Sequence, residues 1–275
     1  MPLPLRPIAF VLAASNHGSM IVNRNDHHVD DKSRPYGVGF QILDKSGFDE
    51  SEVSLVLALL DCRRNHFGNG VVAVDGGANI GVHTIEWARH MYGWGHVLGF
   101  EAQEVLYYAL AGNVALNNCM NARVKLAALG EQCGELVVPQ PDYFKPASFG
   151  SLELRPNPDN EFIGQHIAYD ASACNVVPMV SLDSLGLERL DLLKLDVEGM
   201  ELEVLGGGRS VLAKHRPIML IEVLKSDRAA IERFLGGFGY RVFPAGHLNI
   251  VAVHALDPTL SQITVKNGEP IVAAE

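Results

Sequence analysis

The sequence predicts an α/β fold in which a mostly parallel sheet is covered by helices on both faces. From residue 71 onward, short apolar runs typical of strands alternate with stretches of helical periodicity. Such alternation is typical of parallel sheets whose connecting helices pack on the two faces. The last two expected strands are joined only by Pro244–His247, and a link this short predicts an antiparallel hairpin at the end of the sheet.

The expected elements follow one another along this unit. The strands cover residues 71–75, 96–101, 124–129, 135–138, 175–181, 190–196, 217–223, 240–243 and 248–253, and the helices cover residues 80–92, 103–117, 198–205 and 227–235. Ahead of them, Val53, Val56 and Leu60 recur at helical spacing within residues 49–66, and Asp49 or Ser51 is placed to cap that helix. Residues 139–172 are rich in Pro, Ser and Asn, and a loop this long is usually functional or mobile.

Three regions are expected. Residues 1–48 should form an N-terminal β extension, because strand-like runs occur at residues 8–14, 20–23 and 38–43. Residues 49–256 should form the main domain, and residues 257–275, which lack a clear pattern, a C-terminal tail. The first apolar run is at the short limit for a signal peptide and follows a single arginine and several prolines, so a strand is expected there instead.

Composition narrows the class of protein. Apolar residues make up 48% of the 275 residues, which is ample for a buried core, and the net charge of −10 disfavours a nucleic-acid binder. The four cysteines form no Cys-x-x-Cys pair, so free thiols in a reducing compartment are expected. No run approaches the about 18 apolar residues of a membrane span. These features predict a cytoplasmic protein without nucleic-acid or membrane partners.

A glycine-rich turn after the strand at residues 71–75 predicts a ligand site. The turn reads Asp75-Gly76-Gly77-Ala78-Asn79-Ile80-Gly81, with the acid at the end of the strand. A dinucleotide fingerprint would instead read Gly-x-Gly-x-x-Gly. The Asp75 carboxylate would repel a pyrophosphate but can accept hydrogen bonds from a cationic, amine-bearing ligand, so the turn favours S-adenosylmethionine over a dinucleotide. The alternative is a tight turn without a ligand.

Glu101 ends the second strand, about two dozen residues after the glycine turn. An acid at this position is suited to bind the two hydroxyls of a ribose. The alternative is an ordinary negative charge ahead of the helix that begins near Gln103. Because both S-adenosylmethionine and NAD carry a ribose, Glu101 alone does not distinguish the two.

A third group of acids follows the strand at residues 190–196. Asp196 ends this strand, Glu198 lies in the strand-to-helix turn, and Glu222 lies near the end of the next strand. Carboxylates that converge at one sheet edge can supply a general base, and they could equally bind a divalent metal. For Glu198 and Glu201, the alternative is that they simply favour a helix N-terminus.

Other polar residues are weaker candidates. His83, one turn into the helix after the glycine turn, is expected to be a packing or surface residue, with a minor claim to the site because of its position. His27 and His28 are adjacent, and neighbours on an extended chain point in opposite directions, which disfavours a metal site. Gly206-Gly207-Gly208 follows a helix and is expected to end it.

Taken together, these motifs resemble the FkbM family of S-adenosylmethionine-dependent methyltransferases. The resemblance is carried by Asp75–Gly81 with Thr84, Gly99–Glu101, Tyr107, Leu110, Asn113, Ser181–Leu185, Leu193–Glu201, Val204–Leu205 and Ile221–Glu222. The family often has a proline soon after the acid of the second strand, where this chain has Ala102 and Gln103. The blocks fall within residues 71–243, which is well over half of the chain.

The resemblance implies a doubly wound, Rossmann-like class I methyltransferase fold with a seven-stranded core. It also implies transfer of a methyl group from S-adenosylmethionine to a hydroxyl of a sugar or polyketide-type natural product, a small-molecule or glycan acceptor; we further expect a homodimer. The donor is expected to contact Asp75, Gly76, Gly77, Ala78, Asn79, Gly81, Glu101, Ala102, Ala128, Leu129 and Asp196, and the expected catalytic residues are Asp196, Glu198 and Glu222. Substrate choice is expected to depend on residues 1–48 and 139–172.

Two rival functions come from other classes. A protein of the same fold could bind S-adenosylmethionine or its product without turnover, although the acids at the strand ends disfavour this. A nicotinamide-dependent oxidoreductase is disfavoured because the Gly-x-Gly-x-x-Gly spacing is missing. Methylation of nucleic acid through Lys194, Asp196 and Glu198 is disfavoured because a second lysine of the corresponding motif and a basic surface are lacking.

Overall fold

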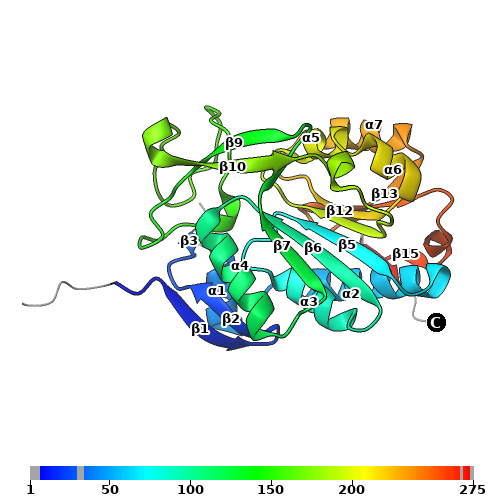
Figure 1. Ribbon diagram of the computed structural model, residues 1–275, viewed down its shortest axis with the longest axis horizontal. Coiled ribbons are helices and arrows are strands. Elements are labelled where there is room, and N and C mark those ends of the chain that lie inside the picture. The colour runs from blue at the N-terminus through cyan, green and yellow to red at the C-terminus, as the bar shows by residue number, and fades with distance from the viewer. Residues whose placement is uncertain (1–6, 30–33, 267–268, 273–275) are drawn as a thin grey trace, which may run out of the picture.

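A seven-stranded sheet forms the centre of the protein. The computed structural model describes residues 7–29, 34–266 and 269–272. The sheet has the strand order β13-β14-β12-β11-β5-β6-β7 (Figure 1). Its strands are β5 (Val71–Gly76), β6 (Gly95–Glu101), β7 (Ala122–Leu126), β11 (Leu192–Leu195), β12 (Ile218–Glu222), β13 (Tyr240–Ala245) and β14 (Asn249–His254). Only β14 is antiparallel to its neighbours, which confirms the predicted parallel sheet with a final hairpin.

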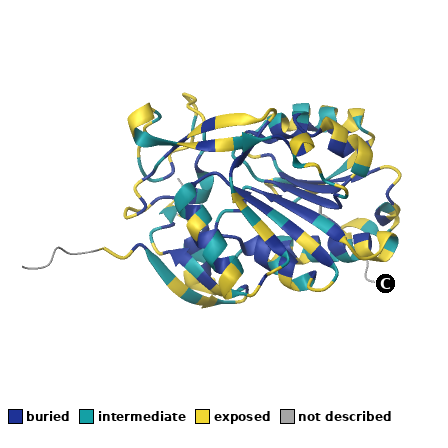
Figure 2. Ribbon diagram, in the orientation of Figure 1, coloured by how far each residue is buried: buried dark blue, intermediate teal, exposed yellow. Residues whose placement is uncertain are grey.

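Helices cover both faces of this sheet. One face packs against α2 (Glu50–Phe67), α3 (Val82–His90) and α4 (Glu104–Leu116), and the other against α5 (Glu201–Gly206), α6 (Arg209–His215) and α7 (Arg228–Gly237). Successive side chains of a strand point to opposite faces, so Leu192 belongs to one core and Leu193 to the other. The central strands are accordingly buried along their length (Figure 2). The fold is therefore doubly wound, as predicted.

The carboxyl ends of four neighbouring strands meet at one edge of the sheet. Leu195 of β11 is paired with Gly76 of β5 and with Ile221 of β12, and Gly76 is paired with Phe100 of β6. The acids that end or follow these strands are thus brought to one edge, where open α/β sheets bind ligands.

The N-terminal region differs from the prediction at one element. The hairpin of β1 (Phe10–Ser15) and β2 (Gly18–Asn23) packs on α4, and β3 (His28–Val29) pairs with β4 (Pro35–Tyr36). The expected strand at residues 38–43 is wrong, because Val38–Lys45 form the helix α1. The helix is stabilised by Asp26, which precedes it in the chain. The buried Asp26 carboxylate accepts a hydrogen bond from the backbone N–H of Gly39 in the first helical turn, where N–H groups lack a partner within the helix (2.8 Å).

Three further regions depart from the expected pattern. The expected strand at residues 124–129 is divided: β7 ends at Leu126, and β8 (Ala128–Leu129) joins β9 (Gly134–Pro139) and β10 (Cys174–Val180) in a separate sheet. The helix α6 was not predicted. The expected tail contains a hairpin of β15 (Ile263–Lys266) and β16 (Glu269–Val272), and part of that tail lies outside the described residues. Between residues 140 and 170, only Phe149–Ser151 form a short 3-10 turn.

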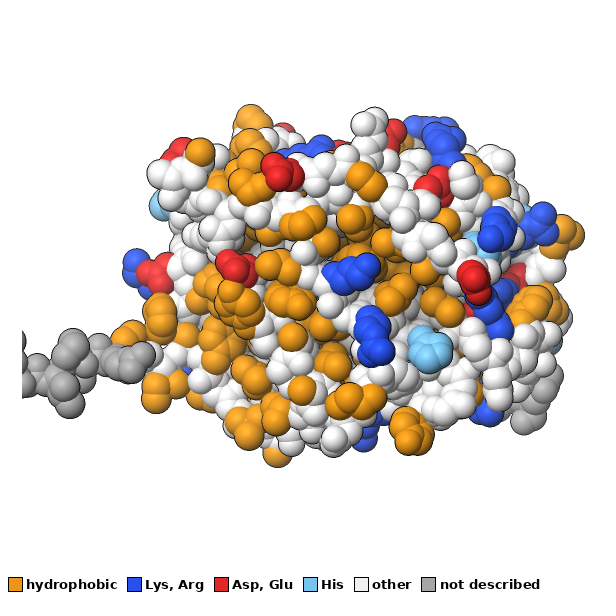
Figure 3. Space-filling model, viewed as in Figure 1, with side chains coloured by type: hydrophobic (Ala, Val, Ile, Leu, Met, Phe, Trp, Pro, Cys, Tyr) orange, Lys and Arg blue, Asp and Glu red, His pale blue; other side chains and the backbone are white. Residues whose placement is uncertain are grey.

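Hydrophobic side chains are also exposed on the outer surface. They gather over α4 and the β1–β2 hairpin on the face shown in Figure 3, where Leu12 and Tyr108 are exposed. In the part of the chain that the structure describes, no helix has both the length and the hydropathy needed to cross a bilayer. The expected homodimer stays a prediction.

A buried ionic cluster fixes α2 against the sheet. The Arg63 guanidinium, on α2, donates hydrogen bonds to Asp191, which precedes β11 (3.2 Å), and to Asp257. All three residues are buried. Removing one member of such a cluster leaves its partners charged and desolvated.

We therefore expect Arg63→Met to lower the free energy of unfolding by about 3–5 kcal/mol, because Asp257 would lose its buried counter-ion. Urea denaturation measures this change. The control is Arg228→Met, which removes the exposed pair with Glu232 and should cost less than about 1 kcal/mol. Equal losses in the two variants would contradict this account of the cluster.

Candidate active site

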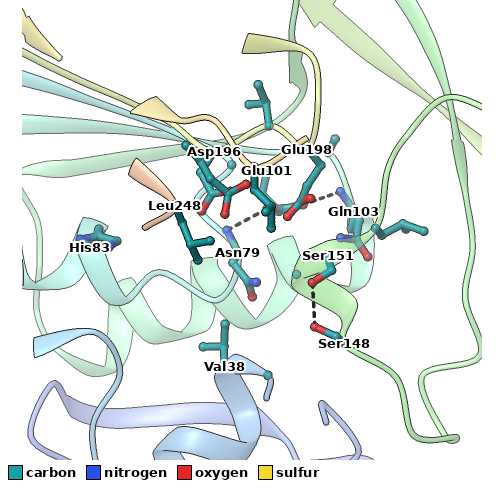
Figure 4. Close-up of a pocket in the computed structure, with 18 of the residues that line it drawn as sticks. Val38, Asn79, His83, Glu101, Gln103, Ser148, Ser151, Asp196, Glu198 and Leu248 are labelled. Carbon is teal, nitrogen blue, oxygen red and sulfur yellow. Dashed lines mark hydrogen bonds between the residues drawn. The ribbon is translucent and has the colours of Figure 1, made fainter. Parts of the chain in front are cut away.

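A cavity of about 320 Å³ lies at the carboxyl edge of the sheet (Figure 4). Its walls come from five parts of the chain: the N-terminal region with the start of α2, the segments that follow β5, β6, β11 and β12, residues 127–129, the segment 148–161, and the start of β14. The predicted site residues that line it are Gly77, Asn79, Glu101, Ala102, Ala128, Leu129, Asp196, Glu198 and Glu222. The sequence therefore located the cavity and much of its wall.

The glycine turn packs closely against the backbone of Asp196 because Gly77 has no side chain. Gly77 has φ +77°, and a Cβ placed on it would lie 1.8 Å from the backbone oxygen of Asp196. The backbone N–H groups of Gly77 and Ala78 both donate to the Phe100 oxygen of the next strand (3.0 and 2.9 Å). The loops after β5, β6 and β11 are therefore packed directly on one another, with Gly77 at the point of contact.

Asp75 does not border the cavity. Its side chain is fully buried, and one carboxylate oxygen accepts a hydrogen bond from the Thr84 hydroxyl of α3 (2.6 Å). The other oxygen has no hydrogen-bond partner among the described residues. Gly76, Ala78 and Gly81 also lie outside the cavity lining. These four residues shape the turn from behind, and the expected direct contact of Asp75 with the donor stays a prediction.

Glu101 presents its carboxylate to the cavity in a fixed orientation. Its two oxygens accept hydrogen bonds from the backbone N–H groups of Asn79 and Gln103, each at 2.8 Å. Burial raises the pKa of Glu101 to about 7, although those backbone donors act in the opposite direction. Each oxygen retains a lone pair that can accept a hydroxyl proton from a ligand.

The three predicted catalytic acids converge. Single carboxylate oxygens of Asp196, Glu198 and Glu222 all lie within 4.8 Å of one another. Burial and the charge of Asp196 raise the pKa of Glu198 well above its usual value and that of Glu222 to about 8. An oxygen-only group with this spacing is of the type that binds divalent cations. A metal was not predicted from the sequence, and a metal requirement stays a hypothesis.

Two lysines neutralise part of this acidic group. The Lys194 ammonium lies 2.9 Å from Asp196, and the Lys225 ammonium lies 2.8 Å from Glu198. The charge of Asp196 and the other nearby carboxylates raise the pKa of Lys194 despite burial, so it remains a cation. No hydrogen bond or ion pair of the Glu222 side chain is found among the described residues. Glu222 is thus the member of the group without a neutralising partner.

Lys225 also anchors the long segment 139–172 to the site. Its ammonium donates to the Ser151 backbone oxygen (2.6 Å) and lies 2.9 Å from Glu161. The same short turn is held by a second contact, because the Gln103 side-chain amide donates to the backbone oxygen of Phe149 (2.8 Å). The sequence identified this segment only by its length and weak periodicity, whereas Gln103 and Lys225 carried no distinguishing pattern.

Backbone strain also gathers at this edge. Asn79 and Glu198 have positive φ angles of 50° and 53°, which residues with a Cβ adopt rarely. Each lies in the first turn after a strand end and lines the cavity. Strain of this kind is retained mainly where it serves a site, and here it directs the loops after β5 and β11 toward the same space.

The sheet order and this cavity define a class I methyltransferase. A sequence profile of the methyltransferase FkbM domain matches residues 75–242. The chain belongs to the FkbM methyltransferase family. The resemblance that was carried by the strand-end motifs is thereby confirmed.

Individual proteins are similar to parts of the chain. The methyltransferase sdnD of Sordaria araneosa is 34% identical over 157 residues, which are 49% of this chain and 59% of that protein. The chain thus aligns with little more than half of this curated relative. An FkbM methyltransferase structure from Methylobacillus flagellatus KT matches with a TM-score of 0.48 and 15% identity, covering 72% of this chain and 48% of that one.

The contact at Gly77 can be tested by substitution. We expect Gly77→Ala to destabilise the protein by more than the roughly 1–2 kcal/mol that a left-handed backbone costs alanine, because the new methyl would overlap the Asp196 oxygen. Gly93→Ala is the matched control, since Gly93 has φ +79° with nothing within 4 Å of an added Cβ. Urea denaturation compares the two, and equal losses would show that the loops do not pack as described.

The raised pKa of Glu222 predicts a pH-dependent stability. Between about pH 4.5 and 8 the folded protein retains a proton that the unfolded chain has released, so the free energy of unfolding falls as pH rises through this window. Glu222→Gln should remove this dependence. The variant's free energy of unfolding should exceed that of the wild type by more at the high-pH end of the window than at the low-pH end, and the two differences should be apart by on the order of 1 kcal/mol. Thermal denaturation across this window measures it, and a parallel shift at every pH would contradict the assignment.

Proposed function

We propose that the protein transfers a methyl group from S-adenosylmethionine to a hydroxyl oxygen of a sugar or natural-product acceptor. The observation that carries the proposal is the distribution of acids in one cavity. Glu101 lies beside Asn79 of the glycine turn, and Asp196 and Glu198 lie next to it (Figure 4). Glu222 lines the same cavity, so one bound donor could contact both parts. Family membership supports methyl transfer, whereas the donor, the hydroxyl acceptor and a cytoplasmic location are parts of the proposal.

The residues of the cavity fit such a donor. The Glu101 carboxylate is held by two backbone N–H groups and can accept both ribose hydroxyls. Phe100, Ala102, Ala128 and Leu129 supply an apolar wall for the base. Gly77 allows the backbone to approach the chain of the ligand closely. When bound, S-adenosylmethionine supplies a methyl group on a positively charged sulfur.

The acidic group would remove the proton of the acceptor hydroxyl. An alcohol is a weak nucleophile at neutral pH, so the oxygen needs a base as it forms its bond to the methyl carbon. Asp196 is kept beside a lysine ammonium. The pKa of Glu198 is raised, and that of Glu222 is raised to about 8, so these carboxylates accept a proton more readily than an ordinary glutamate. We assign proton removal to Asp196, assisted by Glu198 or Glu222. The remaining contribution is positioning of the two reactants.

The charge of the cavity supports a neutral acceptor. Seven of the lining residues are acids: Asp49, Glu52, Glu101, Glu161, Asp196, Glu198 and Glu222. A phosphate or carboxylate on the acceptor would be repelled at these short distances. A sugar or polyketide-type alcohol carries hydroxyls that can donate to the same oxygens. The charge thus disfavours nucleic acid as the acceptor.

The proposal is tested by separating donor binding from turnover. We expect Glu101→Ala to weaken S-adenosylhomocysteine binding roughly 10- to 100-fold, because hydrogen bonds to a charged carboxylate are lost. Asp196→Asn should keep that binding and lose turnover with an accepted alcohol. Isothermal titration calorimetry and a methyl-transfer assay measure the two quantities.

Other outcomes would favour the rival functions. Binding of S-adenosylhomocysteine without methyl transfer to any of a panel of hydroxylated acceptors would favour a non-catalytic binding protein. An increase in melting temperature with NAD but not with S-adenosylhomocysteine would favour an oxidoreductase. Turnover that persists in Asp196→Asn would show that the assignment of this residue is wrong.

A further inference from the structure

Three polar side chains meet at the end of the cavity opposite the apolar wall that would hold the base. The His83 ring, on α3, places Nε2 3.0 Å from a Glu52 oxygen on α2. The side-chain amide of Asn249, at the start of β14, donates to the other Glu52 oxygen. All three residues line the cavity. Elements that are distant in sequence therefore hold one carboxylate and one imidazole in fixed positions at the cavity wall.

The His83 imidazole retains one unused nitrogen. His83 is 6% exposed, and its Nδ1 has no hydrogen-bond partner among the described residues. Nε2 faces the Glu52 carboxylate and donates a hydrogen bond to it, which fixes the orientation of the ring. The unused nitrogen is buried away from the cavity, so His83 acts on a ligand through Glu52 and not through Nδ1. Burial acts to raise the pKa of Glu52, but the hydrogen bond from His83 and the nearby Lys194 ammonium lower it by more, so Glu52 is anionic.

The position of this pair relative to Glu101 indicates which part of a ligand would reach it. In Figure 4, Gln103 lies on one side of Glu101 and Asn79, and His83 lies on the other. A ligand with its base against Phe100 and Ala102 and its ribose at Glu101 would extend over Gly77 and Asn79 toward His83. The far end of S-adenosylmethionine is an amino acid that carries an ammonium group.

We propose that Glu52 and His83 form the subsite for the α-ammonium group of the methyl donor. The proposal rests on the proposed function, since it concerns the same donor in the same cavity. Glu52 supplies the negative charge and the acceptor oxygens, while His83 and Asn249 hold its carboxylate in position. The sequence had assigned this contact to Asp75, which the structure places behind the glycine turn. In this proposal the amine contact comes from α2 and α3, whereas the sequence predicted it at the end of β5.

A second acid–histidine pair between the same two helices provides a matched control. Asp61 on α2 lies 2.8 Å from His90 Nε2 on α3, but both side chains are more exposed and neither lines the cavity. If the Glu52–His83 contact only held α2 against α3, losing either pair would have comparable consequences. A role in binding instead predicts an effect that is specific to the cavity pair and to ligands with an amino-acid end.

The test compares two ligands that differ only in that end. S-adenosylhomocysteine carries the amino acid, whereas 5′-methylthioadenosine keeps the base, the ribose and the sulfur but lacks it. Isothermal titration calorimetry should show that Glu52→Gln and His83→Gln each weaken S-adenosylhomocysteine binding roughly tenfold or more and change 5′-methylthioadenosine binding less than about twofold. Asp61→Asn and His90→Gln should change neither affinity.

Each alternative outcome has a distinct meaning. Equal weakening of both ligands, or an unchanged affinity for S-adenosylhomocysteine, would overturn the subsite while leaving the proposed function intact. Wild-type protein that binds neither ligand would overturn the proposed function and the subsite together. Circular dichroism establishes that each variant is folded; if His83→Gln does not fold, Glu52→Gln near the start of α2 decides the test.

Discussion

The packing of Gly77 against the backbone oxygen of Asp196 is the contact on which the site depends. The Asp196 N–H donates to the Gly76 oxygen (3.0 Å), so the loops after β5 and β11 continue the pairing of their strands beyond the sheet. This contact leaves no room for a side chain at Gly77. It also fixes the distance between the glycine turn and the acidic group, which are the two parts that must act on one ligand.

Negative and positive charges are distributed unequally around this contact. Carboxylates line the cavity, while the neutralising ammonium groups of Lys194 and Lys225 are held against individual members of the group. Glu222 remains without such a partner, and its pKa is raised toward neutrality. When Glu222 gives up its proton, the three carboxylates carry one negative charge more than the two lysines neutralise, and the sulfonium of the proposed donor would offset it. Attraction of this kind strengthens donor binding and is lost when the methyl group has left, which favours release of the uncharged product.

The parts of this arrangement that the sequence predicted are those governed by local patterns. Asp75, Glu101 and Asp196 each end an apolar run, and the rule that parallel strands share a carboxyl edge is sufficient to bring such residues together. The helix at Val38–Lys45 was mistaken for a strand because its first turn is completed by Asp26 from a separate segment. The pairing of Glu52 with His83 depends on how two helices pack, which no spacing along the chain reveals. Local patterns thus located the cavity, while contacts between distant segments completed its wall.

The antiparallel strand β14 has a consequence for the order in which the protein becomes functional during synthesis. It is inserted between β12 and β13, and it delivers Asn249 to the Glu52 carboxylate at the cavity wall. A nascent chain that still lacks this strand has the glycine turn, Glu101 and Asp196, but its sheet is unfinished and its cavity is open on one side. The sheet and the cavity wall are therefore completed by the same strand, so a ligand that needs this wall binds only after β14 has been inserted.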